Sequence, residues 1–419
     1  MSKINDLIRE LCPNGVEYKP FYSVAKYIRG ITYNKNNETD VDNSYKVLRA
    51  NNITLDSNKI NFVDVKKVYK TVKVRDEQWL KKSDILICAG SGSKEHIGKV
   101  AYITEDIDYT FGGFMGVIRC NPLINSSFMF HILTSSIFRN HIGITINSTT
   151  INNINNQTFE NFNIPIPPLE VQEEIVRILD KFGELEAELE AELEARKSQY
   201  EFWREKLFEL DECEWKTTEE LFDTITDYVA NGSFKSIADN VSYKNEKDYA
   251  VLLRTVDYSN GYDNNKFIYI DEHAYNFLSK SKLFGGEIII NNIGAGVGTT
   301  FLCPDLGMPM SLAPNTIMMR TPNNKFYYYW FNSKRGQESI ESVTAKSAMP
   351  KFNKTGFRKL LVPVPTLEKQ NKIVETLDKF EKLISDISIG LPAEIDLRRK
   401  QYEYYRNKLL SFEELSVSE

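Results

Sequence analysis

The sequence has few of the residues that disulfides, metal sites and membrane spans require. Its five cysteines are scattered and never spaced as CxxC, and its four histidines lack the spacing of metal ligands. We therefore expect free thiols and no metal site. No apolar run approaches the roughly 18 residues of a membrane span, and MSKINDLIREL at the start lacks the apolar core of a signal peptide. These absences predict a cytoplasmic protein without membrane association.

Motifs of common nucleotide-dependent enzymes are missing as well. NIGAGVG (292–298) has the glycine spacing of a dinucleotide fingerprint, but strand-like FLC follows it where a helix should bind the phosphate. GSGSKEHIGKV (90–100) is not a Walker loop, because Val100 follows Gly98 and Lys99. The Asn/Asp-Pro-Pro-aromatic tetrad of adenine amino-methyltransferases is absent, and we find no nuclease or helicase motif. The chain is therefore predicted to be non-catalytic.

The most regular feature that is present is a four-residue word written three times, ELEAELEAELEA (184–195). Its residues are strong helix formers, and leucines four apart make one apolar ridge on a helix. The spacing continues on both sides for roughly 40 residues, or about 60 Å of helix. Such a helix must bury its ridge, and a second long helix is the usual partner.

Two helical blocks of the sequence occur twice. FENFNIPIPPLEVQEEIVRILDKF (159–182) reappears as FRKLLVPVPTLEKQNKIVETLDKF (357–380), and QYEFWREKLF (199–208) reappears as QYEYYRNKLL (401–410). The offset is 198 for the first pair and 202 for the second, so the first copy is one four-residue word shorter between the blocks. The chain is thus an internal duplication.

The segments between the helical blocks also correspond. YKVLRANNI (45–53) parallels AVLLRTVDY (250–258), and KKSDILICAGSG (81–92) parallels FGGEIIINNIGAG (284–296). Apolar β-branched runs bounded by Gly, Asn and Ser are typical of short strands joined by turns. We expect an α+β fold with two globular domains related by the internal duplication (pseudo-twofold), each followed by a long helix of a coiled coil. The expected boundaries are 1–160 for the first domain, 161–211 for the first helix, 212–358 for the second domain and 359–419 for the second helix.

Two local departures from this plan are expected. Gly390 and Pro392 in SIGLPAEI (388–395) should kink the second helix near 388–392, where the first copy has its ELEA words. Residues 3–12 should form a short helix beside the end of the second long helix, because LIRELC resembles the end of the first one.

Charge is distributed unevenly along the chain. Residues 1–160 carry a net charge of +4 and residues 161–212 carry −9, whereas residues 213–358 are neutral and the remainder carries −1. The acidity therefore belongs to the first helix and does not argue against DNA binding by the globular parts. Composition alone leaves nucleic acid binding undecided.

Short polar loops in both domains contain the side chains that match base edges and phosphates. An ordinary surface position is the alternative for each of them, since Asn-rich loops are also common in proteins of AT-rich genomes. The candidate DNA-binding residues are Arg49, Asn51, Asn52, Ser93, Lys94, Thr149 and Asn152 in the first domain, and Arg254, Asn291, Asn292, Lys346, Ser347 and Lys351 in the second. The candidate residues for packing of the helices or of partner subunits are Leu179, Phe182, Leu185, Leu189, Leu193, Tyr200, Trp203, Leu377, Phe380, Tyr402 and Tyr405.

Four blocks of the sequence carry a resemblance to a known family, namely LIRELCPNGVEYK, IPIPPLEVQEEIVRILDKF, ARKSQYEFWREKLF and GLPAEIDLRRKQYEYYRNKLLSF. Together they resemble the specificity subunits of type I restriction-modification systems, and the resemblance covers essentially the whole chain. It implies two target recognition domains, each reading one half of a split, asymmetric site in double-stranded DNA. It also implies that the two long helices run antiparallel as a coiled-coil spacer that separates the domains, sets their spacing and docks two modification (methyltransferase) subunits.

The resemblance places the cofactors in other chains. S-adenosylmethionine would bind the modification subunits, and ATP and Mg²⁺ the restriction (motor and nuclease) subunits, with no cofactor in this chain. Two other interpretations stay open: a structural coiled-coil scaffold without sequence-specific binding, and a divergent stand-alone methyltransferase or nuclease, for which the duplication leaves little room.

The length of the word suggests a ruler. Four residues add about 6 Å and about 40° beyond a full helical turn, and 40° is close to the rotation between neighbouring base pairs in a duplex of about 10–10.5 pairs per turn. Whole words could thus be added while the leucine ridge stays nearly in register.

Overall fold

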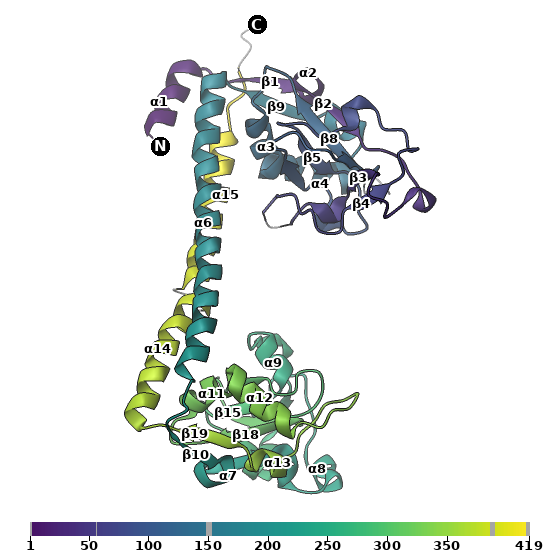
Figure 1. Cartoon of the computed structure of the whole chain (residues 1–419). Coiled ribbons are helices and arrows are strands. Elements are labelled where there is room, and N and C mark those ends of the chain that lie inside the picture. The colour runs from purple at the N-terminus through teal and green to yellow at the C-terminus, as the bar shows by residue number, and fades with distance from the viewer. Residues whose placement is uncertain (1, 56, 148–152, 386–389, 416–419) are drawn as a thin grey trace. The chain divides into compact units, whose positions relative to one another are not determined.

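The computed structural model describes residues 2–55, 57–147, 153–385 and 390–415, which fold into two compact units (Figure 1). The first unit comprises Met1–Glu190 with Glu394–Glu419, and the second comprises Ala191–Ala393. Each unit contains a globular part, which we call its head, and segments of long helix. Within the described ranges, no helix is both long and apolar enough to cross a membrane, and no three His, Cys, Asp or Glu side chains are grouped to hold a metal ion.

The first head has three small sheets, with strand orders β2-β8-β5-β6, β4-β3-β7 and β1-β9. The strands are β1 (Glu17–Pro20), β2 (Ala25–Arg29), β3 (Tyr45–Leu48), β4 (Lys66–Val68), β5 (Ile85–Cys88), β6 (Val100–Tyr102), β7 (Thr110–Phe111), β8 (Met115–Cys120) and β9 (Asn163–Ile166). The helices are α2 (Phe21–Val24), α3 (Ser126–Thr134), α4 (Ser136–Asn147) and α5 (Asn156–Glu160).

The second head repeats this topology with the orders β11-β18-β15-β16, β13-β12-β17-β14 and β10-β19. Its strands are β10 (Glu214–Thr217), β11 (Thr224–Asp227), β12 (Ala250–Leu253), β13 (Tyr269–Ile270), β14 (Lys282–Leu283), β15 (Ile288–Asn291), β16 (Thr300–Leu302), β17 (Met310–Leu312), β18 (Thr316–Arg320) and β19 (Leu361–Val364). Its helices are α7 (Thr218–Leu221), α8 (Phe234–Asn240), α9 (Thr255–Ser259), α10 (Glu272–Phe277), α11 (Asn324–Asn332), α12 (Lys334–Val343) and α13 (Lys354–Arg358). The expected α+β duplication is confirmed, with β14 as an addition.

The central strand of each head is apolar on both faces because it separates two cores. In β5, Ile85 and Ile87 join one buried cluster, while Leu86 and Cys88 join another. In β15, Ile288 and Ile290 likewise face one core and Ile289 faces the second. Alternate side chains of a strand point to opposite faces, so a run such as ILIC or IIIN requires cover on both sides.

A buried acid–arginine pair recurs in both heads and was not found from the sequence. Asp84 is 1% exposed and accepts from Nε and an Nη of Arg119, at 2.7 and 2.6 Å. Glu287, 2% exposed, accepts from the same groups of Arg320, at 3.3 and 3.0 Å. Each arginine also donates to a backbone carbonyl, and each acid accepts from the backbone N–H three residues before it. The pair therefore joins β8 to β5 and β18 to β15.

The first long helix is α6 (Leu169–Leu207), whereas the second copy has two helices, α14 (Leu367–Ser385) and α15 (Leu391–Leu410). The interruption agrees with the expected effect of Gly390 and Pro392, because α15 begins only after this glycine. Residues 386–389 lie outside the described residues.

A buried glutamine follows the start of the long helix in each copy. The Nε2 of Gln172 donates to the carbonyl of Pro167 at 2.8 Å, and its Oε1 accepts from the N–H of Asn125. Gln370 repeats the first contact with Pro365 at 3.0 Å. The prolines lack N–H groups and restrict the preceding backbone, so the glutamine side chain secures the turn by which each helix leaves its head.

Within the first unit, the beginning of α6 packs beside the end of α15. Phe182 stacks on Tyr405 with ring centroids 5.5 Å apart, and Arg399 pairs with Glu186 and Glu190. Residues later in α6 contact residues earlier in α15, so these two helical segments are antiparallel. Leu179 of α6 and Leu409 and Leu410 of α15 lie in one core with the first head.

Within the second unit, the end of α6 packs beside α14. The rings of Tyr200 and Phe380 lie 6.4 Å apart, and Phe208 and Leu210 share the core of the second head with Leu377. Each head is therefore covered by the start of its own helix and by the end of the helix from the other copy.

The predicted packing residues are buried to different degrees. Leu179 and Leu377 are fully buried, and Trp203 is 42% exposed. The other predicted positions are half-buried, namely Phe182, Leu185, Leu189, Leu193, Tyr200, Phe380, Tyr402 and Tyr405.

The short helix expected at residues 3–12 is α1 (Ser2–Leu11). Ile4 is fully buried in the same core as Leu409 and Leu410, and Lys3 pairs with Glu174 at 3.1 Å. The chain beyond α15 returns to this place, where Val16 forms a parallel bridge with Glu414.

Replacing Arg119 by alanine should destabilise the first head by about 3 kcal/mol, because the Asp84 carboxylate would remain buried without its cation. Urea denaturation would measure the loss, and hydrogen exchange would locate it at β5 and β8. Arg9→Ala removes only an exposed pair with Asp6 and should cost less than about 1 kcal/mol. Equal losses of unfolding free energy in the two variants would show that the buried pair stabilises the protein no more than the exposed pair does.

Candidate nucleic-acid interface

A hollow of about 640 Å³, here the first hollow, lies where β2 ends and β8 begins in the first head. It is built from the end of β2 and the loop after it, the turn after β3, the loop after β5 and the loop before β8. The residues that line it are Arg29, Ile31, Thr32, Tyr33, Asn34, Lys35, Glu38, Arg49, Ala50, Asn51, Gly90, Ser91, Gly92, Gly112, Gly113, Phe114 and Met115.

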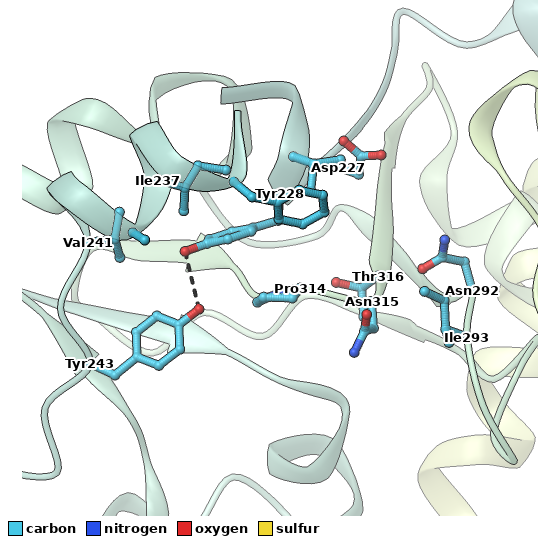
Figure 2. A pocket seen from close by; sticks show the side chains of 13 residues that line it. Asp227, Tyr228, Ile237, Val241, Tyr243, Asn292, Ile293, Pro314, Asn315 and Thr316 are labelled. Carbon is cyan, nitrogen blue, oxygen red and sulfur yellow. Dashed lines mark hydrogen bonds between the residues drawn. The ribbon is translucent and has the colours of Figure 1, made fainter. Parts of the chain in front are cut away.

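The second head has a hollow of about 570 Å³, the second hollow (Figure 2). It is built from the end of β11, α8, the loop after β15 and the loop before β18. The residues that line it are Asp227, Tyr228, Val229, Phe234, Ile237, Ala238, Val241, Tyr243, Asn292, Ile293, Pro314, Asn315 and Thr316.

The strand register shows that the two hollows occupy equivalent places. Arg119 of the duplicated ion pair lies opposite Lys26 in the first head, and Arg320 lies opposite Thr224 in the second. Arg29 lies three residues after Lys26 and is the last residue of β2, and Asp227 lies three residues after Thr224 and is the last residue of β11. Counting back five residues from the two arginines makes Phe114 equivalent to Asn315 and, one earlier, Gly113 to Pro314.

The loops after β5 and β15 are held in the same way, which supports the equivalence. Gly90 forms an antiparallel bridge with Asn153, and Ile293 forms one with Lys351. One residue earlier, the carbonyl of Ala89 accepts from Ile154 at 2.7 Å, and that of Asn292 accepts from Phe352 at 3.1 Å.

The lining of the first hollow has three basic side chains, Arg29, Lys35 and Arg49, and one acidic side chain. Its one carboxylate, Glu38, is paired with Lys66 at 2.9 Å outside the lining. Arg49 is paired with Asp64 at 2.9 Å. Arg29 and Lys35 are exposed, and among the described residues neither has a carboxylate within 4 Å. The hollow thus presents two cations that nothing in the described part of the chain neutralises, which suits an anionic or acceptor-rich ligand.

The second hollow is apolar and aromatic, with no lysine or arginine in its lining. Asp227 accepts from Lys354 at 2.8 Å and from the N–H of Ala230 at 2.9 Å, so its charge is compensated. Tyr243 donates to the hydroxyl of Tyr228 at 3.2 Å (Figure 2). Burial raises the pKa of Tyr228, so this ring stays neutral at physiological pH. Phe234 is 84% exposed and Tyr243 is 55% exposed.

The structure brings only some of the predicted residues of the first head together. Arg49 and Asn51 both line the first hollow. Ser93 lies beyond its edge, bonded to Glu95, and Lys94 begins a short 3₁₀ helix. Thr149 and Asn152 lie outside the described residues.

Asn52 has a structural role, contrary to the expectation from its sequence context. It is 0% exposed, its Oδ1 accepts from the N–H of Arg49, and its Nδ2 donates to the carbonyls of Asn61 and Val63. All its polar groups are occupied, so it holds the turn that presents Arg49 and Asn51. Sequence alone could not separate the two neighbouring asparagines.

The predicted residues of the second head lie in four places. Arg254 makes a bidentate pair with Asp257, in a turn equivalent to that of Arg49 and Asn52. Asn291 is 8% exposed and thus belongs largely to the interior, whereas Asn292 lines the second hollow. The others, Lys346, Ser347 and Lys351, are exposed on a loop closed by a bridge from Ala345 to Lys351, which also pairs with Ile293 of the hollow.

Several lining residues were missed from the sequence, notably Arg29, Lys35 and Phe114 in the first head and Phe234 and Asn315 in the second. They come from loops with no motif of their own. Arg29 and Asp227 could have been identified as lining residues because they end equivalent strands. This equivalence becomes visible only when the pairing register of the strands is known.

Two copies of one head, each with a polar or aromatic hollow at the same strand ends and joined through long helices, define a class of two-headed recognition proteins. The comparisons with known proteins agree. The family model for the type I restriction modification DNA specificity domain matches residues 13–195 and again 207–397. The chain therefore belongs to this family and carries two copies of its domain.

Individual relatives support the assignment. The chain is 35% identical over 285 residues to the EcoR124I/EcoR124II specificity subunit of Escherichia coli, covering 62% of this chain and 65% of that one. It is 38% identical over 170 residues to the EcoKI specificity subunit of Escherichia coli K12, covering 40% and 36%. The chain thus spans less than two thirds of the length of either relative.

Solved structures show the same fold. The HsdS subunit of Thermoanaerobacter tengcongensis aligns with a TM-score of 0.51 at 16% identity, over 96% of this chain and 97% of that one. A chain from a study of complex assembly and conformational transition in the type I R-M system aligns with a TM-score of 0.64 at 15% identity, over 95% and 98%.

The neighbouring asparagines should respond differently to replacement by alanine. Asn52→Ala leaves buried carbonyl and N–H groups unpaired and should cost about 1–3 kcal/mol of unfolding free energy. Asn51→Ala affects an exposed side chain and should leave stability within about 0.5 kcal/mol. Denaturation of both variants would test this assignment, and a stable Asn52→Ala protein would refute the structural role.

Proposed function

We propose that this chain is the specificity subunit of a type I restriction-modification system. Each head reads one half of a bipartite, asymmetric site in double-stranded DNA, and the paired helices set the number of unspecified base pairs between the halves. The chain itself carries out no chemistry. The observation that carries the proposal is the hollow repeated at equivalent strand ends in two copies of the family domain.

The charge of the two heads is compatible with this role. The first head has unpaired cations where its loops converge, and such groups can bind phosphates with release of counterions. The acidic surface of α6 would repel DNA, so contact is expected at the heads rather than along the helix. This division suits a protein that reads two separated short sequences.

The catalytic groups belong to partner chains in this proposal. Two modification subunits would bind S-adenosylmethionine and methylate adenine in each half-site, and restriction subunits would use ATP and Mg²⁺ for translocation and cleavage. Methylome sequencing of DNA from a methylation-free host that expresses this chain with its modification subunit tests the proposal. A split motif with a fixed gap supports it, and an intact complex that methylates no such motif would overturn it.

Deleting one ELEA word should shorten the unspecified gap by about one base pair and leave both half-sites unchanged. Any of the three words may be removed, because every choice yields the same sequence, including acidic residues for Arg399 to pair with. The reason is geometric, since deleting four residues removes about 6 Å of helix and about 40° of rotation beyond a full turn.

The same methylome sequencing measures the gap, and a single-residue deletion of Ala187 is the control. It would rotate the following ridge by about 100° and should abolish methylation rather than change the gap. A gap that keeps its length after deletion of a whole word would refute the ruler.

The docking places for the two modification subunits are inferred from exposed aromatics on the helices. Phe202 of α6 is 61% exposed and Tyr404 of α15 is 60% exposed. They occupy equivalent positions of the repeated block QYEFW and QYEYY. Large exposed aromatics at duplicated positions suit two copies of one partner, because aromatic side chains are common interface anchors.

Phe202→Ala should weaken the binding of one modification subunit by about ten-fold or more, and Tyr404→Ala should weaken the other, with both lost in the double variant. Mass spectrometry of intact complexes would count the subunits bound. Folding should be unaffected, because both rings are exposed. Phe62→Ala, at a 50% exposed ring of the first head, is the control and should leave assembly intact. Full assembly by the double variant would place the docking surface elsewhere.

A further inference from the structure

The two hollows provide an internal comparison, because both heads face the same kind of DNA backbone but different bases. Residues that contact phosphates have the same task in both heads, so they are expected to recur. Residues that read bases should differ between the heads, because the half-sites differ. Equivalent lining positions with opposite chemistry therefore point to base readout.

The largest contrast is at the end of β2 and β11. Arg29 stands there in the first head, and Asp227 stands there in the second. The framework around them is unchanged, since the Asp84–Arg119 and Glu287–Arg320 pairs recur with the same backbone contacts. A reversal of charge on a conserved scaffold is difficult to reconcile with a shared phosphate contact.

Arg29 is placed to present its guanidinium to a ligand. Its Nε donates to the carbonyl of Gly113 at 3.4 Å, which orients the side chain along the loop before β8. This bond leaves both terminal Nη groups without a partner among the described residues. Asn51 and Asn34 line the same hollow and add further amides.

On these grounds we propose that Arg29 reads a guanine of the first half-site, and that the second head reads an A·T pair at the corresponding place through Asn315. This rests on the proposed function and assigns the base class that each hollow recognises. A guanidinium fork matches the N7 and O6 acceptors of guanine in the major groove, and an asparagine amide matches N6 and N7 of adenine.

The second hollow cannot accommodate the same guanine contact. Its lining has no cation, and Asp227 would face guanine acceptors with a carboxylate. Asn315 is exposed, its side chain makes no hydrogen bond to described residues, and it projects beside Pro314 and Thr316 (Figure 2). The apolar wall of Ile237 and Val241 suits the thymine methyl group, which is the apolar feature of an A·T pair.

Asn315 has a backbone φ of 69°, in the left-handed region. Asparagine and glycine adopt this conformation most readily, so Asn315→Gly removes the amide with little strain, whereas alanine would add strain of its own. The change therefore tests recognition rather than folding.

The experiment compares methylomes from complexes that contain the wild-type chain, Arg29→Ala, Arg29→Lys or Lys35→Ala. Arg29→Ala should relax one G·C position of the first half-site, lowering discrimination about 5- to 150-fold, with the second half-site unchanged. Arg29→Lys keeps the charge but loses the fork, so it should relax the same position. Lys35→Ala, in the same hollow, should weaken DNA binding evenly for all sequences and lower the salt dependence.

A parallel arm uses Asn315→Gly, which should relax one A·T position of the second half-site only. Full specificity in the Arg29 variants, or an even loss that Arg29→Lys restores, would overturn the guanine assignment. A G·C pair at the position relaxed by Asn315→Gly would overturn the adenine assignment. If the wild-type complex methylates no bipartite site, the proposed function itself fails. This outcome is distinct from failure of the base assignments, which is judged from the variants while the wild-type complex methylates its site.

Discussion

Each head completes its core with the end of a helix that belongs to the other copy. In the first unit, Leu409 and Leu410 of α15 are buried with Leu179 at the beginning of α6. In the second, Phe208 and Leu210 after α6 are buried with Leu377 of α14. Burying such side chains is worth roughly 1.5–3 kcal/mol each, so neither head is complete without the other copy. This interdependence makes the helices part of both heads rather than a passive linker, and a change in helix length must respect the packing at both ends.

The duplication separates what the fold requires from what recognition requires. The acid–arginine pair and the glutamine–proline contact at each helix start recur, because both heads need the same sheet and the same helix start. The hollows occupy the same place but differ in nearly every lining side chain. A scaffold that keeps its buried polar contacts can vary its loops without loss of the fold, which is the usual way in which one fold serves different ligands.

Sequence reasoning was most successful where the physics is local. Helix propensity and four-residue spacing predicted α6, and Gly390 with Pro392 predicted that the second helix would not continue. Repeated blocks predicted two α+β heads. It was weaker where distant residues meet: Asp84 and Arg119 are joined only by strand pairing, and the hollows arise from loops that lack a motif. Residue type alone predicts a DNA contact for Asn52 and Asn291. Burial, which a single sequence does not reveal, gives Asn52 a structural role and leaves Asn291 only 8% exposed.

The difference between the hollows also bears on how a two-headed protein avoids binding half of its site. In the proposed function, Lys35 of the first hollow would add affinity for any DNA, whereas the second hollow has an apolar lining and a compensated carboxylate, so it would gain little from phosphates alone. If both heads bound strongly to any backbone, the complex would dwell on sequences with one correct half. On the proposal, both heads would read bases, but only the first would also hold DNA through a sequence-independent contact, so the second would decide whether the full site is present. Specificity is then a difference in affinity that only the correct second half supplies.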